Sequence, residues 1–282
     1  MNRETEGTLL AFLGMFLYGI EPVVIKANPT NPMSFAAFSA IIASLILWPI
    51  VFSTSSWKEA RESPQYIPKA ALVGVFGTAL AYIAYSYGAQ LSTAINASLI
   101  TRAEVLFSFM LSYIILREKI TKNQILWSIL ILLGLTLVIT QGKVIVPRKG
   151  DLLLLLVPLF WQSGHVIAKR LPYNPFLIAA FRNTFGGILL LLLALPRGLK
   201  FSKFAIAEAL ILSLGQVVWY LSIKRINLSK ATAIITPAPA VAIGVAIVLG
   251  ETFTSYHMVG FILITVGTLM VGRIKSELKE SS

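Results

Sequence analysis

Long apolar runs dominate the sequence and leave little room for any fold other than a helical bundle in a membrane. Ten such runs, each of roughly 18–24 residues, are long enough for a helix to cross about 30 Å of hydrocarbon. They lack the short alternating segments that are typical of a transmembrane β-barrel. We therefore predict an all-α integral membrane protein with ten transmembrane helices. The runs cover residues 8–27, 32–52, 67–88, 93–116, 123–141, 151–170, 175–196, 204–223, 231–250 and 255–272.

Composition supports the membrane prediction and excludes several classes of protein. Apolar residues make up 56% of the chain and charged residues only 13%, whereas soluble domains carry about 25% charged residues. The absence of cysteine excludes disulfides and thiolate metal sites. The net charge of +12 comes from short basic clusters between apolar runs, where they meet lipid headgroups. We therefore expect the bilayer as a partner, and neither nucleic acid nor a cofactor.

The distribution of Lys and Arg predicts the orientation of the chain. The connections on the same side as the N-terminus hold fifteen Lys and Arg residues, and those on the other side hold seven. Basic residues concentrate in cytoplasmic connections. The sequence thus predicts a multi-pass protein of the cell membrane with both termini in the cytoplasm. We expect a monomer.

A segment of the chain occurs twice. Residues 31–38 read NPMSFAAF, and residues 174–181, found 143 positions later, read NPFLIAAF. The preceding segments, VVIK at 23–26 and VIAK at 166–169, match at the same offset. We infer an internal duplication with halves at 1–145 and 146–282. Five spans in each half would place the halves in opposite orientations, related by a pseudo-two-fold axis in the membrane plane.

Charged residues inside the predicted spans are the first candidates for a functional site, since a charge in hydrocarbon must face protein or water. These candidates are Glu21, Arg102, Glu104 and His165, and a fifth such residue, Arg182, is expected to have a structural role. Pro22 follows Glu21 and removes a helical hydrogen bond, and broken helices often mark transport sites. Arg102 and Glu104 lie about 200° apart on a regular helix, so we expect them to face different neighbours. Glu21 is the expected partner of Arg102, although a structural ion pair remains the alternative.

Aromatic and amide side chains are the second group of candidates. Tyr82 and Tyr85 share one face of their predicted helix, and so do Gln216 and Trp219. A sparsely polar aromatic lining suits an amphipathic organic solute better than a bare ion. Ordinary helix packing is the alternative for each of them, and for His165. The predicted lining consists of Tyr18, Tyr82, Tyr85, Trp161, Gln216 and Trp219.

Several motifs resemble the drug/metabolite transporter superfamily, in its EamA-type branch. Tyr18-Gly19 followed by residues 23–26 is similar to that family's aromatic-glycine pair and Lys in the first span. Trp161 with residues 166–169 is similar to the same pattern in the sixth span. Gly250-Glu251 looks like the family's Gly-Glu pair at the end of a repeat's fourth span.

The first half departs from this pattern at two places. Arg117-Glu118 is a variant of the Gly-Glu pair, and Ser39 stands where the second half has Arg182, a position at which the family often has Arg. The resemblance implies two five-helix EamA-like repeats around a central cavity, with export or exchange of small metabolites such as amino acids.

We therefore predict a secondary transporter that works by alternating access, with Glu21 or Glu104 binding a proton or a cationic group of the substrate. A nucleotide-sugar or sugar-phosphate exchanger is one alternative, because Lys26, Arg102, Lys169 and Arg182 could meet a phosphate. An intramembrane lipid-modifying enzyme is another. The sequence lacks the His-Glu-x-x-His and Gly-x-Ser-x-Gly motifs of such enzymes, so we expect no enzymatic activity.

Overall fold

A computed structural model describes residues 3–111, 114, 122–142, 148–223, 225–226, 234–235 and 237–273, and in these residues it contains helices and connecting turns but no strand. The first half contains α1 (Arg3–Ala27), α2 (Pro32–Ser53), α3 (Trp57–Glu62), η1 (Pro64–Tyr66), α4 (Ile67–Gly74), η2 (Val75–Leu80), α5 (Ala81–Gln90), α6 (Ala94–Ile100), η3 (Thr101–Ala103), α7 (Glu104–Leu111) and α8 (Lys122–Thr140). The second half contains α9 (Lys149–Lys169), α10 (Pro175–Ala194), η5 (Leu195–Arg197), α11 (Phe204–Ile223), α13 (Ala238–Val248) and α14 (Ser255–Arg273). The predicted all-α fold is confirmed.

Six helical segments in the described part of the chain are long and apolar enough to cross a membrane. They are α1, α2, Pro64–Gln90, Lys149–Ala168, Pro175–Arg197 and Phe204–Ser222. Three further apolar helices, Ile125–Thr140, Ala238–Val248 and Ser255–Met270, are shorter. The fourth and ninth predicted spans include residues outside the described ranges, so the count of ten stays a prediction. Large apolar side chains such as Leu45 and Val248 are exposed, as expected for a surface that faces lipid.

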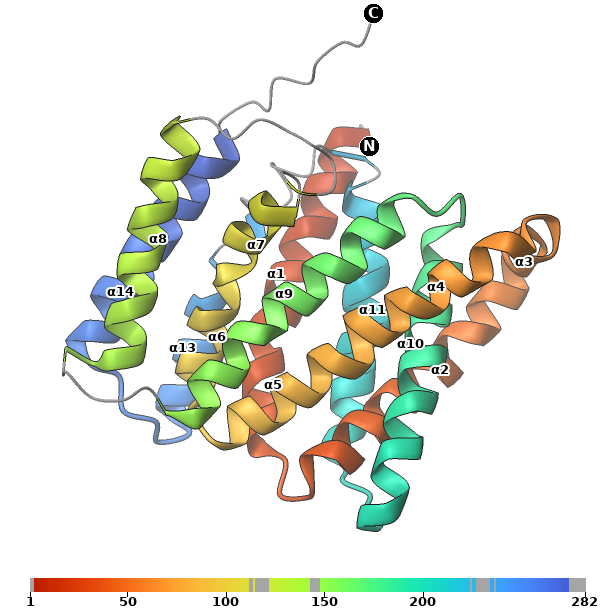
Figure 1. Cartoon of the computed structure of the whole chain (residues 1–282), viewed down its shortest axis with the longest axis horizontal. Helices are drawn as coiled ribbons and strands as arrows, with labels where there is room; N and C mark the ends of the chain where they lie inside the picture. The colour runs from red at the N-terminus through yellow and green to blue at the C-terminus, as the bar shows by residue number, and fades with distance from the viewer. Residues whose placement is uncertain are drawn as a thin grey trace, which may run out of the picture.

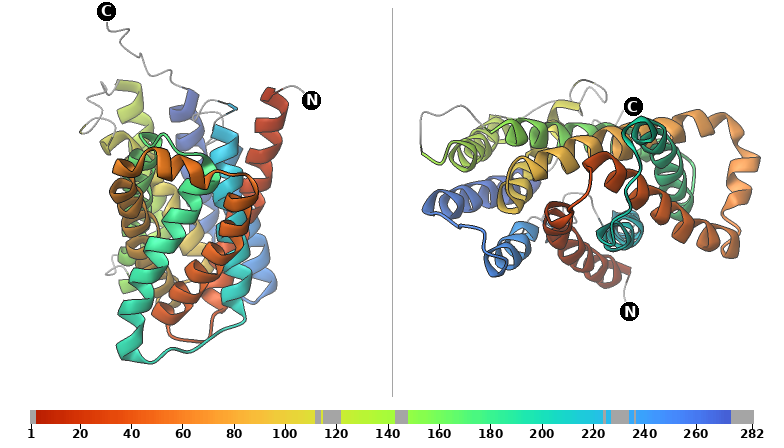
Figure 2. Two further views of the ribbon diagram at one scale, coloured as in Figure 1. Left: turned by 90° about the vertical axis from the view of Figure 1, so that its right-hand side faces the viewer. Right: turned by 90° about the horizontal axis from the view of Figure 1, so that it is seen from below.

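Equivalent helices of the two halves pack against each other. The α2–α10 contact is antiparallel: Ser34 Oγ donates to the Gly198 carbonyl at 3.3 Å, and the Ser44 and Thr184 hydroxyls are 2.7 Å apart. Helices α8 and α14 form a second such pair. Figure 1 shows this pair at the left of the bundle and the α2–α10 pair at the right, and Figure 2 gives two further views.

The remaining helices of each half pack on the other half in a reciprocal pattern. Helix α1 contacts α11 and α13 of the second half, and α9 contacts α5, α6 and α7 of the first half. The end of α1 and the beginning of α9 both lie beside the α5–α6 turn, where Lys26 Nζ donates to the Ser92 carbonyl at 2.6 Å and Gly150 approaches Leu91. The two equivalent helices therefore run in opposite directions. Helix α1 begins and α14 ends at the same end of the bundle (Figures 1 and 2).

The duplicated Asn-Pro segment begins the second helix of each half. The Asn31 side chain accepts the Met33 amide at 2.8 Å, and the Asn174 side chain accepts the Phe176 amide at 3.1 Å. A proline occupies the first helical position in both cases. Asn at the N-cap and Pro directly after it are favourable at a helix start. The repeated motif is thus a repeated helix cap.

Repeated glycines allow close packing between α8 and α14. A Cβ atom on Gly134 would lie 2.8 Å from Ile264 and 2.9 Å from the Gly260 carbonyl. A Cβ atom on Gly267 would lie 2.6 Å from Ile131. Small residues let helices approach closely in a membrane, where packing replaces much of the hydrophobic driving force. These glycines bring the last helices of the two halves into contact.

The proline pair of the ninth predicted span differs from expectation. The apolar run 231–250 predicts one continuous helix, in which Pro237 and Pro239 would free carbonyl groups. In the structure Pro237 is the N-cap of α13 and Pro239 lies in its first turn. Proline at a helix start costs no hydrogen bond, because the first amides have no partner within the helix. Pro22 and Pro158, by contrast, lie inside α1 and α9.

Candidate functional site

Glu21 is buried in the middle of the bundle. It lies in the apolar helix α1 directly before Pro22, and only 1% of its surface is exposed. The Tyr82 hydroxyl, from α5, donates a hydrogen bond to Glu21 Oε1. A buried carboxylate is costly unless it has hydrogen-bond donors or opposite charges nearby. The sequence-predicted residues Glu21 and Tyr82 are therefore in direct contact.

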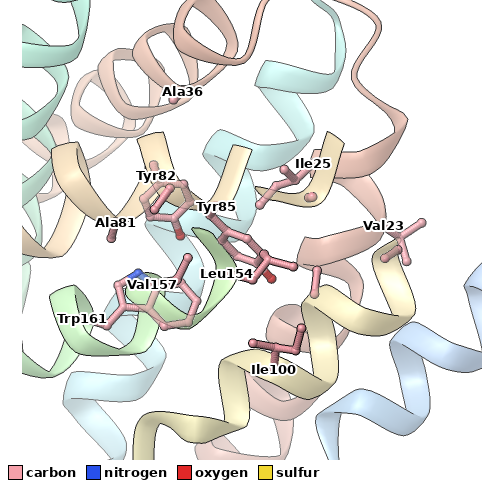
Figure 3. Close-up of a cluster of buried hydrophobic side chains, with 14 of the residues drawn as sticks. Val23, Ile25, Ala36, Ala81, Tyr82, Tyr85, Ile100, Leu154, Val157 and Trp161 are labelled. Carbon is pink, nitrogen blue, oxygen red and sulfur yellow. The ribbon is translucent and has the colours of Figure 1, made fainter. Parts of the chain in front are cut away.

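Three aromatic rings form one wall beside Glu21. The ring centroid of Tyr85 is 6.1 Å from that of Tyr82 and 5.5 Å from that of Trp161, and the last two are 6.3 Å apart. Figure 3 shows the three side chains converging from α5 and α9. The indole Nε1 of Trp161 is buried without a hydrogen-bond partner in the described part of the chain. An aromatic wall with an unused donor can contact a solute that is partly apolar and partly polar.

A second buried carboxylate, Glu208 of α11, lies beside Glu21. Its exposed fraction is 0%, and its carboxyl group is close enough to that of Glu21 for the two to influence each other electrostatically. Neither Glu208 oxygen has a hydrogen-bond partner within the described residues. The site thus holds two buried acidic groups that lie near each other, one from each half of the chain.

Arg182 of α10 supplies a buried positive charge. It is 4% exposed, its Nη2 donates to the Gly77 carbonyl at 2.6 Å, and its Nε donates to Thr78 Oγ1 at 3.3 Å. Gly77 lies in η2, a π-helical turn that disturbs the regular hydrogen-bond ladder. A Cβ atom on Gly77 would lie 3.0 Å from Arg182 Nε, so the missing side chain makes room for the guanidinium. The ion pairs found in the described residues do not include Arg182.

A second group of predicted site residues lies near Arg182. It consists of Tyr18, His165, Gln216 and Trp219. The His165 ring lies 6.4 Å from that of Trp219 and packs edge-on against Tyr220, also at 6.4 Å. Tyr18 lies against Gly215, and Gln216 accepts a hydrogen bond from Asn183 at 2.8 Å. Tyr18, His165 and Trp219 are only partly buried. The predicted site residues therefore form two adjoining groups, one around Glu21 and one around Arg182.

Arg102 and Glu104 form an ion pair with each other, which corrects the expectation that they face different neighbours. Arg102 Nη1 lies 2.9 Å from Glu104 Oε1. The expectation assumed a regular α-helix, but residues Thr101–Ala103 form a 3₁₀ turn. A 3₁₀ helix has three residues per turn instead of 3.6, so the angle around the helix axis between two residues two positions apart is smaller than in an α-helix. The long side chains of Arg102 and Glu104 span the remaining distance. Glu21 is therefore not the ion-pair partner of Arg102.

Comparison with known proteins agrees with this architecture. The model of the EamA-like transporter family matches residues 5–140 and again residues 148–273. The chain belongs to the EamA-like transporter family. An uncharacterized transporter of Methanothermobacter thermautotrophicus is 25% identical over 95% of this chain and 87% of its own length. The uncharacterized transporter YyaM of Bacillus subtilis is 25% identical over 85% of this chain and 84% of its own length.

A protein of known crystal structure has the same fold as this EamA-like chain. It is 15% identical, covers 94% of the chain and 97% of its own length, and superposes with a TM-score of 0.66. The chain is therefore a multi-pass membrane protein with the two-repeat EamA fold.

Sequence reasoning missed one acidic residue of this EamA-like site. Glu208 is a single carboxylate inside the apolar run 204–223, and that isolation is the signal that could have found it. It also missed Asp151, which begins an apolar run and is nevertheless 0% exposed. Acidic residues near the start of a helix usually face solvent, so position alone indicated an ordinary helix terminus.

Proposed function

We propose that this EamA-family chain is a secondary transporter that moves small organic metabolites such as amino acids by alternating access. The observation that carries the proposal is the set of buried charges between the two halves. Glu21, Glu208 and Arg182 lie inside the bundle, and none of them has an ion-pair partner within the described residues. Intramembrane charges of this kind typically mark a transport path.

The arrangement of charge supports a zwitterionic substrate. Arg182 offers a guanidinium to a carboxylate, and the Glu21–Glu208 pair offers acceptors to an ammonium group. The rings of Tyr82, Tyr85 and Trp161 offer an apolar surface to the rest of the solute. The proposed substrate therefore binds with its carboxylate towards α10 and its amino group towards α1 and α11.

The carboxylate pair also supports proton coupling. Two carboxylates near each other in a buried site repel each other strongly when both are ionised, so we propose that they share one proton. The ammonium group of an arriving substrate would take the place of that proton. Release of one proton for each substrate bound would couple solute movement to the proton gradient. We propose export as the physiological direction, in a cell membrane with both termini in the cytoplasm.

A phosphate-bearing substrate receives less support. Of the four basic residues that could meet a phosphate, Arg102 is paired with Glu104 and Lys26 donates to backbone carbonyls at one end of the bundle. The side chain of Lys169 lies outside the described part of the structure. Arg182 alone would then face two or more negative charges, whereas one guanidinium matches one carboxylate well.

Proteoliposome flux would test the proposal. The probes are an amino acid such as phenylalanine, its decarboxylated amine 2-phenylethylamine and its deaminated acid 3-phenylpropanoate, each with and without a pH gradient. We expect the parent protein to prefer the amino acid, and a pH gradient to change its flux. In a competition assay, Arg182→Gln should selectively weaken the inhibition of amino-acid flux by the acid. Glu208→Gln should selectively weaken the inhibition of amino-acid flux by the amine.

Two results would contradict parts of this proposal. Equal competition by all three probes in the parent and in both variants would remove the charge-based substrate assignment. Flux that does not respond to the pH gradient, and is the same in Glu21→Gln as in the parent, would remove Glu21 from the mechanism. Absence of any flux across a broad set of amino acids would exclude this substrate class.

A further inference from the structure

A buried polar cluster joins the two halves at the end of the bundle opposite to the start of α1. The first half contributes Ser92 and Asn96 from the α5–α6 region, and the second half contributes Asp151, Glu251 and His257. We refer to these five residues as the inter-repeat cluster. The contacts between its members cross from one half of the chain to the other, and none of its members belongs to the proposed substrate site.

Glu251 holds the first turn of α6. Its Oε1 accepts the Ala94 amide at 2.8 Å, and its Oε2 accepts the Ile95 amide at 3.1 Å. Thr93, the N-cap residue, accepts the Asn96 amide at 3.0 Å. A carboxylate at a helix N-terminus makes charge-assisted hydrogen bonds and interacts favourably with the helix dipole. Two amides of a first-half helix therefore depend on a second-half side chain.

Asp151 and His257 hold the same segment from two other helices. Asp151 Oδ1 accepts Ser92 Oγ at 2.5 Å and Asn96 Nδ2 at 3.0 Å. The Asn96 side-chain oxygen lies 2.9 Å from His257 Nε2, and His257 Nδ1 accepts the Thr254 amide at 3.1 Å. Because Nδ1 is an acceptor, Nε2 carries the hydrogen and donates to Asn96. Asn96 thus bridges α9 and α14.

We infer that the inter-repeat cluster holds this end of the bundle closed, and that opening it is the step that gives access to the interior from this side. The inference rests on the proposed function in one respect, since it assumes that the halves move relative to each other. Such a movement must separate the residue 92–96 segment from α9 or α14, and these are the hydrogen bonds that resist the separation. Glu251 contributes most, because its carboxylate makes two bonds to backbone amides that have no other partner in α6.

The absence of cysteine from the chain allows a direct test by thiol labelling. Ala97→Cys places a thiol in α6 at a position that is 0% exposed and directly follows Asn96 of the cluster. The rate of maleimide labelling, measured on protein in nanodiscs, then reports how often this end opens. Glu251→Gln keeps the size of the side chain but replaces one acceptor by a donor. We expect it to accelerate labelling about tenfold, the effect of losing one charge-assisted hydrogen bond.

Two controls separate local opening from general loosening. Glu6→Gln is a matched substitution at the opposite end, where Glu6 pairs with Arg225 at 3.0 Å, and it should leave the Ala97→Cys rate unchanged. Ala40→Cys reports on the buried α2–α10 contact and should not react faster in Glu251→Gln. Asp151→Asn serves as a second cluster variant, and we expect a smaller acceleration from it.

The inference would be overturned if Glu251→Gln and Asp151→Asn both left the rate of maleimide labelling at Ala97→Cys unchanged. Equal acceleration at Ala97→Cys and Ala40→Cys would also overturn it, because the cluster would then stabilise the whole fold and not one end. The labelling requires no substrate, so this result is independent of the flux experiments. A protein that labels as expected but carries no amino acid would refute the proposed substrate and leave the closed end in place.

Discussion

The Tyr82 hydroxyl donates a hydrogen bond to the Glu21 carboxylate across the contact between α5 and α1. This bond links two helices of the first half at the point where the second half contributes Glu208. It gives the Glu21 carboxylate a fixed hydrogen-bond donor in the buried interior of the bundle.

Tyr82→Phe tests this role. Loss of a hydrogen bond to a charged group costs about 1.5–3 kcal/mol, so we expect substrate affinity to fall roughly tenfold or more, measured by equilibrium binding. Tyr85→Phe is the matched control, because it removes a hydroxyl from the same aromatic wall without touching the Glu21 bond. Equal losses in both variants would mean that the wall, and not the bond, determines affinity.

Gly77→Ala should mimic loss of Arg182. The new Cβ atom would lie 3.0 Å from Arg182 Nε and 3.2 Å from Cζ, so the guanidinium must move away from the Gly77 carbonyl. We expect competition by 3-phenylpropanoate in the flux assay to weaken in Gly77→Ala as it does in Arg182→Gln. Gly244→Ala is the control, because a Cβ atom there meets nothing within 4 Å. An unchanged competition profile in Gly77→Ala would show that the guanidinium position does not matter for recognition.

Gly134→Ala and Gly267→Ala should each destabilise the α8–α14 pair. The added methyl groups overlap Ile264 and Ile131 respectively, and overpacking of this kind costs about 1–3 kcal/mol. We expect a lower apparent melting temperature in detergent for both, while Gly244→Ala should be neutral or slightly stabilising. In the double variant the apparent melting temperature should fall by less than the sum of the two single decreases, since the first overlap already separates the helices. Full additivity would argue that the two contacts are independent.

Glu104→Gln should be more harmful than removal of the whole Arg102–Glu104 pair. The single change removes the countercharge of the Arg102 guanidinium, and the Arg102 side chain is only 8% exposed. The combined Arg102→Met and Glu104→Leu variant replaces both charges by apolar groups and should recover much of the lost thermal stability. A double variant as unstable as the single one would instead indicate that Arg102 serves another partner.

The sequence predicted the bundle because its controlling features are local and repeated. Apolar runs of helical length define the spans, and the duplicated segments at 31–38 and 174–181 indicate two equivalent halves. The grouping of Tyr82 with Tyr85 was also predictable, since a spacing of three residues places side chains on one face. The packing of Trp161 against them depends on how α9 lies on α5. The halves' exact boundaries and the number of spans remain predictions.

The irregular helices account for what the sequence did not predict. The residues Thr101–Ala103 show no pattern that predicts a 3₁₀ turn, so the pairing of Arg102 with Glu104 could not be derived from regular helix geometry. The sequence also does not predict the π-helical turn at Val75–Leu80, in which the Gly77 carbonyl accepts a hydrogen bond from Arg182. The contact between Glu21 and Glu208 depends on how α1 packs on α11, and periodicity within one helix carries no information about such a neighbour.

Helix α6 has a further consequence for how the molecule moves. It is only seven residues long, and the Ala94 and Ile95 amides at its beginning are satisfied by Glu251. If Glu251 withdraws, those amides must be hydrated, and the first turn is expected to fray. Parting of the repeats on this side would then be accompanied by partial melting of a helix, so the energy of the proposed conformational cycle would include a helix–coil transition as well as a rigid-body rotation.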